Sequence, residues 1–357
     1  MIPRWMNNPE GKEPFDPSGM LQNVLDMPFH FQDARYRVLN QPPRLKAKKI
    51  RSVLLSGLGG SAIGGDILRT LVWKNSPFCF SVNRHYDLPG WVGRDTLVLS
   101  SSYSGGTEET LSVFKQALAK KIPILVISSG GQLLEEARKK RLPLLQIPGG
   151  LPPRAAFGYS FATLLTAMES LKLLQSHETD FQETLSLLVT LAQRYGLSNP
   201  ASKNQAKQLA SFLYGKLPVI YAGQDHLDSV ALRWKCQMHE NAKQWAATGT
   251  VPEMNHNEVL SFTYPEKPTK QIAAILLRQP QADHPQISRR FDILRNILKS
   301  KTAGVREVKA EGKSLLAQMM SVLYLGDFAS VYLAYLKGID PTPIELIDQF
   351  KKLLSQR

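Results

Sequence analysis

Short apolar runs and stretches of helical spacing alternate along the first 150 residues of the chain. A short apolar run bounded by turn residues predicts a buried strand, and apolar residues three and four positions apart predict an amphipathic helix. Such strands are expected at 52–60, where the run ends in a glycine turn, and at 78–82, 95–101, 122–128 and 142–148. Helices are expected between them at 61–73, 107–121 and 132–141. Strands that alternate with helices predict a parallel sheet covered on both faces.

The same alternation begins again after a helical stretch at 158–195. Its strands are expected at 217–223, 271–279 and 304–312, and its helices at 225–246, 287–300, 313–338 and 342–355. The two halves share a plan without a close sequence repeat. We therefore predict an α/β protein with two domains, each a mainly parallel sheet flanked by helices. The expected division is 1–157, linking helices at 158–195, and 196–357.

The length of 357 residues fits two domains of ordinary size. The N-terminus lacks the apolar core of a signal peptide, and no uninterrupted apolar run approaches the roughly 18 residues that a membrane span requires. The two cysteines, Cys79 and Cys236, are far apart and have no CxxC spacing. These features predict a cytoplasmic protein with free, mostly buried thiols.

The net charge of +14 raises the question of nucleic-acid binding. The basic residues are spread along the chain in short clusters such as 44–51 and 138–141, without the concentration and interleaved aromatic residues that a nucleic-acid binder tends to show. No nucleic-acid partner is expected. A positive field would instead attract a small dianionic substrate.

The glycine turn "GLGGSAIGG" first suggests a dinucleotide site. Gly57, Gly59 and Ala62 fit the spacing G-x-G-x-x-A between a strand and a helix. An NAD site also needs an acidic residue after the second strand, where this chain has "NRH". Arg84 could hold the extra phosphate of NADP, so a dehydrogenase remains an alternative. Tight packing of strand on helix would also explain the glycines.

The second unusual loop, "SSYSGGT" at 101–107, is rich in hydroxyl groups and follows another strand of the first half. Ligands of an open parallel sheet bind beyond the carboxyl ends of its strands, where both loops lie. The start of the next helix offers free N–H groups and the positive end of its dipole. Helix capping by Thr107 would explain one hydroxyl but not those of Ser102 and Ser104. The loop therefore predicts a phosphate site that needs neither metal nor lysine.

These loops resemble a known family. "GLGGSAIGGD" and "SSYSGGTEET" are similar to the signature loops of sugar isomerase (SIS) domains, and the chain resembles the bifunctional phosphoglucose/phosphomannose isomerases within them. The resemblance continues through "PPRAAFGY", "HENAK", "PEMNHNEV" and "LGDFASVYLAYLKGIDPTPIELIDQFKK". There are two departures: Gly106 stands where the family usually has asparagine, and Ala62 where it often has glycine. It implies two SIS-type domains. It also implies that the phosphate is held by Gly59, Gly60, Ser61, Ser102, Ser104 and Thr107.

Aldose–ketose isomerisation needs a base that moves a proton between C2 and C1, an acid–base group that opens the sugar ring, and a group that stabilises the enediolate. The resemblance implies that Glu240, in "HENAK", is the base. Read from the spacing alone, Glu240 is better explained as a solvated helix carboxylate paired with Lys243, three positions on, and only the resemblance favours the catalytic role.

The resemblance also implies that His256, in "PEMNHNE", opens the ring, in its own subunit or in the partner's active site. Histidine titrates near neutral pH, which suits that role. A loop histidine bonded to Glu253 or Glu258 is the structural alternative. The spacing HExxH is absent, so no metal is expected.

Two cations complete the expected site. Arg154, in "PPRAAFGY", is similar to the family arginine near the reacting carbons, and a surface arginine at a helix start is its alternative. Lys351 is similar to a family lysine that reaches the active site, with Lys352 as a rival and a solvated lysine pair as the alternative.

The expected function is the interconversion of glucose 6-phosphate and mannose 6-phosphate with fructose 6-phosphate, through a cis-enediol and without a cofactor. The resemblance implies a homodimer with a shared active site. A non-catalytic SIS regulator that binds a sugar phosphate and an NADP-dependent dehydrogenase are the alternatives. No helix-turn-helix segment, which a regulator usually carries, stands outside the two halves.

Overall fold

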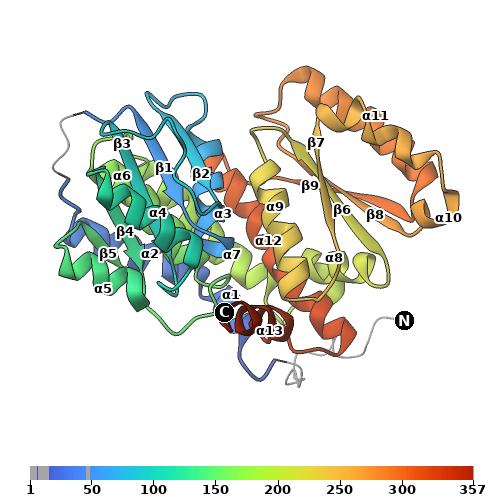
Figure 1. Ribbon diagram of the computed structural model, residues 1–357. Helices are drawn as coiled ribbons and strands as arrows, with labels where there is room; N and C mark the ends of the chain where they lie inside the picture. The colour runs from blue at the N-terminus through green and yellow to red at the C-terminus, as the bar shows by residue number, and fades with distance from the viewer. Residues whose placement is uncertain (1–5, 7–15, 46–48, 357) are drawn as a thin grey trace. The chain divides into compact units, whose positions relative to one another are not determined.

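The computed structural model describes residues 6, 16–45 and 49–356, so the start of the chain lies mostly outside the described residues. The chain forms two compact units (Figure 1). The N-terminal unit consists of Asp26–Val189 together with Gly312–Gln318. The C-terminal unit consists of the described residues before Asp26, Thr190–Glu311 and the chain from Met319 onward. The division at 1–157, 158–195 and 196–357 stays a prediction.

The N-terminal unit is built on a five-stranded sheet in the order β2-β1-β3-β4-β5, and every neighbouring pair is parallel. Helix α3 packs on β1 and β2 and beside α6, α4 packs on β3, and α5 packs on β4 and β5. The strands are β1 (Ser52–Ser56), β2 (Cys79–Asn83), β3 (Thr96–Ser102), β4 (Ile124–Ser128) and β5 (Leu144–Gln146). The helices are α2 (Met27–Asn40), α3 (Gly59–Val72), α4 (Glu108–Ala119), α5 (Gly131–Lys139), α6 (Phe157–Ser170) and the start of α7 (Glu178–Tyr195).

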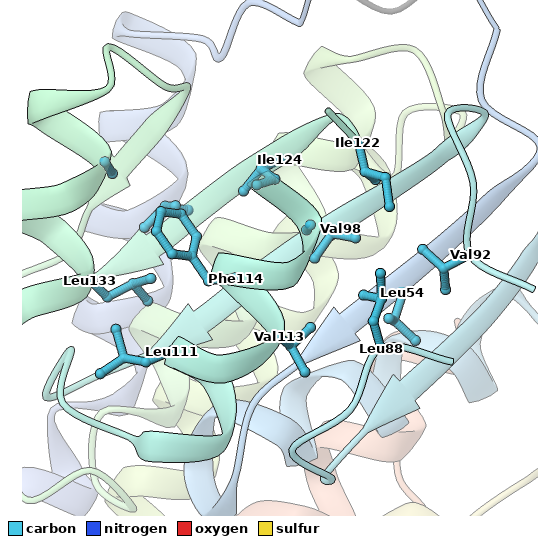
Figure 2. Close-up of a cluster of buried hydrophobic side chains, with 13 residues drawn as sticks. Leu54, Leu88, Val92, Val98, Leu111, Val113, Phe114, Ile122, Ile124 and Leu133 are labelled. Carbon is cyan, nitrogen blue, oxygen red and sulfur yellow. The ribbon is translucent and has the colours of Figure 1, made fainter. Parts of the chain in front are cut away.

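Apolar side chains of the central strands form the core of this unit. Every residue of β3 and β4 is buried, as expected for strands covered on both faces. Figure 2 shows Phe114 of α4 in one cluster with Val98 of β3 and Ile124 of β4. The apolar stripe that predicted α4 is therefore the face that packs on the sheet.

The C-terminal unit contains a four-stranded parallel sheet in the order β7-β6-β8-β9. Two parallel sheets flanked by helices confirm the α/β class and the shared plan of the halves. The strands are β6 (Leu217–Gly223), β7 (Ala247–Val251), β8 (Ile272–Arg278) and β9 (Gly304–Lys309). The helices are α1 (Met20–Leu25), α8 (Gln205–Leu213), α9 (Asp228–Glu240), α10 (Glu266–Thr269), α11 (Pro285–Lys301), α13 (Glu345–Leu354) and most of α12 (Leu315–Lys337).

Three expectations about the two units were wrong. The helix expected at 225–246 ends at Glu240, and β7, "ATGTV", was not expected at all. Two threonines and a glycine give β7 too little apolar character to stand out as a strand. Cys79, expected to be buried, is exposed at the start of β2, whereas Cys236 is half-buried, and both are free.

Helix α12 is long and apolar enough to cross a membrane by length and composition, yet 94% of its apolar window is buried inside the protein. Its contacts are those of a core helix. Trp234 of α9 donates its indole N–H to the Val322 carbonyl at 2.9 Å, and Gly326 gives the ring room to approach. The buried Asp327 accepts hydrogen bonds from Arg233 and Gln237 at 2.6–3.0 Å.

Candidate functional site

The glycine turn and the hydroxyl loop meet where the strand order of the first sheet reverses. β1 pairs with β2 on one side and with β3 on the other, so the loops after β1 and β3 leave neighbouring parallel strands at one edge. This switch point is where open α/β sheets bind ligands. The sequence placed both loops correctly at that edge.

The two loops are joined by direct contacts. Tyr103 donates its backbone N–H to the Ser61 hydroxyl at 3.1 Å. A side chain at Gly57 would lie 2.7 Å from the Ser101 carbonyl oxygen, so only glycine allows this approach. Ser61, in the first turn of α3, is therefore held against the hydroxyl loop and not pointed freely into solvent.

The hydroxyl groups of the second loop bond to one another and to the loop backbone. The Ser102 and Thr107 hydroxyls lie 2.8 Å apart, and Gly105 donates its N–H to Ser102 Oγ at 3.1 Å. Thr107 occupies the N-cap position of α4, as the capping alternative requires, but its side chain makes no capping hydrogen bond. The first N–H groups of α4 therefore remain open to another acceptor, which suits an anion.

Gly105 and Gly106 have different steric surroundings. Gly105 has φ +70°, and a Cβ there would lie 1.8 Å from the Gly130 carbonyl oxygen. The loop after β4, which carries Gly130 and Gly131, thus supports the hydroxyl loop. We did not predict this contact, although a glycine pair between a strand and a helix was its signal. A Cβ at Gly106 would meet nothing within 4 Å, so the backbone there also has room for the Cβ of the asparagine that is usual in the family.

Arg154 lies just before α6 and is 3% exposed, which excludes the surface-arginine alternative. The backbone beside it packs on the glycine turn, since a Cβ at Gly60 would lie 2.7 Å from the Pro153 carbonyl oxygen. A buried guanidinium can stabilise negative charge on a ligand bound beside it.

Arg84, which a dehydrogenase would need for NADP, pairs with Asp66 of α3 at the end of β2. This ion pair gives Arg84 a structural partner within the N-terminal unit. The dinucleotide interpretation thereby loses the residue on which it depended.

Glu240 is the last residue of α9 and is half-buried. The chain that follows lies at the amino edge of the second sheet, because Gln244 donates to the carbonyl of Lys216, just before β6. Lys243 Nζ donates to the Asp340 and Pro341 carbonyls at 3.0 Å, in the segment between α12 and α13.

His256 is exposed and follows β7 at the carboxyl edge of the same sheet, between two short 3-10 helices, η3 (Glu253–Asn255) and η4 (Glu258–Phe262). Strand β7 lies between the end of α9 and His256 in the sequence, and it runs from one edge of the sheet to the other. Glu240 and His256 of one chain therefore start from opposite edges of one sheet, an arrangement that spacing in the sequence did not reveal.

Lys351 and Lys352 are both exposed on α13, a helix without a buried residue. The structure thus does not choose between them. Among the described residues, no group of three or more histidine, cysteine, aspartate or glutamate side chains could hold a metal ion.

Comparison with known proteins identifies the family. A family profile described as the bacterial phospho-glucose isomerase C-terminal SIS domain matches residues 202–354. The chain is 40% identical to the bifunctional phosphoglucose/phosphomannose isomerase of Caldicellulosiruptor bescii over 94% of its own length and 99% of that protein. The chain belongs to the bifunctional phosphoglucose/phosphomannose isomerase family.

Other comparisons agree with membership of the isomerase family. The isomerase of the same name from Aquifex aeolicus is 33% identical over 86% of this chain and 91% of that protein. Among solved structures, a hypothetical protein of Thermus thermophilus matches with a TM-score of 0.71 and 16% identity, over 96% of this chain and 91% of that one. At that identity the structural match supports the fold alone.

Proposed function

We propose that this protein interconverts glucose 6-phosphate and mannose 6-phosphate with fructose 6-phosphate. The observation that carries the proposal is the pair of joined loops at the β1/β3 switch point, in a chain whose 40% identical relative is named a bifunctional phosphoglucose/phosphomannose isomerase. The reaction needs no electron acceptor, because the hydrogen lost at C2 returns at C1.

We further propose that each unit contains an SIS-type domain. The profile match to residues 202–354 supports this for the C-terminal unit. For the N-terminal unit the support is its own parallel sheet and the two loops that resemble SIS signatures. A cytoplasmic location and the absence of a nucleic-acid partner stay predictions from the sequence.

In this proposal the substrate phosphate binds at the start of α3 and α4. Backbone N–H groups at a helix start and small hydroxyls bind a dianion without a metal, and the helix dipoles favour its charge. Both helices begin without a side-chain cap from the preceding residue, which leaves their first N–H groups available. The groups assigned to the phosphate are Gly59, Gly60, Ser61, Ser102, Ser104 and Thr107.

The remaining roles concern the sugar. Glu240 takes the proton from one carbon and returns it to the other, His256 opens the ring, and Arg154 stabilises the enediolate. Lys351 is assigned a place beside the reacting carbons. The burial of Arg154 supports its role, because a buried guanidinium is worth more to a developing charge than a solvated one.

A homodimer with His256 acting in the partner's site is also proposed. Its first support is that Glu240 and His256 of one chain start from opposite edges of a sheet. Its second is exposed apolar surface, which in soluble proteins marks interaction sites. The exposed side chains concerned are Leu260, Tyr264, Leu346, Phe350 and Leu353, which are 60–82% exposed.

The decisive experiment is an isomerase assay with EDTA present and both aldose phosphates as substrates. Fructose 6-phosphate formation, detected by a coupled reaction after quenching, needs no nicotinamide in the isomerisation step. Glu240→Ala should abolish turnover while substrate binding, measured by calorimetry, remains. Glu135→Ala, which removes an exposed helix glutamate of α5, is the control. Normal turnover by Glu240→Ala would remove the proposed base, and a sensor or dehydrogenase would show no isomerisation at all.

A further inference from the structure

A buried tyrosine of the second sheet is bonded to the segment that carries His256. Tyr221 lies in β6 with 0% exposure, and its hydroxyl donates to Glu258 Oε1 at 2.5 Å. Glu258 begins η4, two residues after His256. Bonds from a hydroxyl to a carboxylate are short and strong. Burial, and then the Glu258 carboxylate, raise the pKa of Tyr221, so the hydroxyl remains a donor at any working pH.

The neighbouring strand leaves room for this bond. Gly249 of β7 is directly opposite Tyr221 in the sheet. A Cβ at Gly249 would lie 2.6 Å from Tyr221 Cε1 and 2.8 Å from Glu258 Oε2. Glycine weakens a strand interior, so its presence here fits a site where two other groups must pass closely.

Short hydrogen bonds connect Glu258 to His256 through the backbone. The Glu258 N–H donates to the Asn257 side-chain oxygen at 2.5 Å, and the Asn257 amide donates to Glu253 Oε1 at 2.8 Å. The His256 N–H donates to the Glu253 carbonyl at 3.0 Å. Within the described part of the chain, the His256 imidazole itself makes no hydrogen bond. Its position therefore depends on the backbone that these bonds hold.

We propose that Tyr221, through Glu258, is a positioning residue for His256, and that the pair is needed for ring opening but not for proton transfer between C2 and C1. The proposal rests on the function proposed above. Arg290 offers the segment a weaker contact, to Asn255 Oδ1 at 3.5 Å. The Tyr221–Glu258 bond is shorter, and its donor side chain is fully buried.

Ring opening can be measured separately from isomerisation. When the C1–O5 bond breaks, O5 gains a proton, the C1 hydroxyl loses one, and C1 becomes an aldehyde. Re-closure on either face of C1 then exchanges the α and β anomers. Exchange spectroscopy by NMR reports this step on glucose 6-phosphate even when the C2 proton does not move. A Glu240→Gln background removes the isomerisation and keeps the ring-opening step.

The test compares Tyr221→Phe with a matched tyrosine variant in that background. Tyr332, in α12, is also buried, and its hydroxyl donates to the Tyr195 carbonyl at 2.6 Å. Tyr332→Phe therefore removes one buried hydroxyl, as Tyr221→Phe does. A positioned acid–base group contributes about 100-fold or more to such a step. We expect Tyr221→Phe to slow enzyme-dependent anomer exchange at least about 10-fold. Tyr332→Phe should keep the rate of anomer exchange within about 2-fold of the rate in the Glu240→Gln background. The two tyrosine variants should lose a similar amount of melting temperature.

A second pair of variants separates positioning from folding. Glu258→Gln keeps an oxygen acceptor and should retain most anomer exchange, whereas Glu258→Leu should lose it as Tyr221→Phe does. Equal exchange rates in Tyr221→Phe and Tyr332→Phe, or equal rates in the two Glu258 variants, would overturn the proposal. If the unaltered protein does not isomerise hexose 6-phosphates, the proposed function fails instead.

Discussion

The contrast between Gly105 and Gly106 gives the sharpest test of the hydroxyl loop. Gly105 has φ +70°, which costs an L-residue about 1–2 kcal/mol. The new methyl of Gly105→Ala would also lie 1.8 Å from the Gly130 carbonyl oxygen, so two backbone segments must separate. Overpacking of this kind typically costs about 1–3 kcal/mol. Together these terms predict about 2–5 kcal/mol of lost stability.

The same displacement should weaken substrate binding. Moving the loop shifts the N–H groups proposed to hold the phosphate, and a hydrogen bond to a charged group contributes about 1.5–3 kcal/mol. The KM for hexose 6-phosphate should therefore rise about 10- to 100-fold. Gly106→Ala is the control, since its Cβ meets nothing within 4 Å and surface changes stay within about 0.5 kcal/mol.

Urea denaturation and steady-state kinetics on both variants measure the two effects. Gly106→Asn, which restores the usual family residue, should behave like Gly106→Ala. The reasoning is refuted if Gly105→Ala matches Gly106→Ala in unfolding midpoint and in KM, because the loop would then tolerate a backbone shift that we take to be damaging.

Three further outcomes are expected. Ser102→Ala removes the hydroxyl that the Gly105 N–H and Thr107 share, while the Gly105 N–H keeps the Ser102 carbonyl at 3.2 Å; it should raise KM about 10-fold at a cost of about 0.5–1.5 kcal/mol in stability. Arg233→Met leaves the buried Asp327 carboxylate without its cation and should cost about 3–5 kcal/mol in urea denaturation. The Glu169 carboxylate raises the pKa of His177 above 6.5, so the pair's stabilisation is complete below pH 6.5 and is lost as the pH rises through the raised value. Melting temperatures from pH 6 to 9 should fall less steeply in His177→Gln.

Much of the fold could be predicted because its strands are covered on both faces. β4 is buried at every position, and its first four residues, "ILVI", form a continuous apolar run that needs no tertiary information to be recognised. β7 could not be found in the same way. Gly249 in β7 leaves space for the side chains of Tyr221 and Glu258. Because glycine has a low strand propensity, a glycine required by these tertiary contacts weakens the sequence signal of the strand.

The place of the hydroxyl loop could be predicted from the sequence, but the arrangement of the other groups could not. Small hydroxyls and glycines at 101–107 follow an apolar run and precede a helical pattern, and the loop indeed lies between β3 and α4. Its binding of phosphate stays a prediction. Glu240 and His256 are 16 positions apart, and the sequence did not show that a strand lies between them. This strand, β7, places them at opposite edges of one sheet.

The segment Gly312–Gln318 belongs to the N-terminal unit although it follows most of the C-terminal one. Glu183 accepts hydrogen bonds from the Lys313 and Ser314 N–H groups at 2.6 and 3.0 Å, which ties the segment to α7. On the ribosome, the N-terminal unit cannot be completed when Val189 emerges. At a translation rate of about 5–20 residues per second, Gln318 is added roughly 6–26 s after Val189. During that time the N-terminal unit lacks its contacts with Gly312–Gln318. A nascent-chain arrest before that point should therefore yield a first unit that proteases still cut.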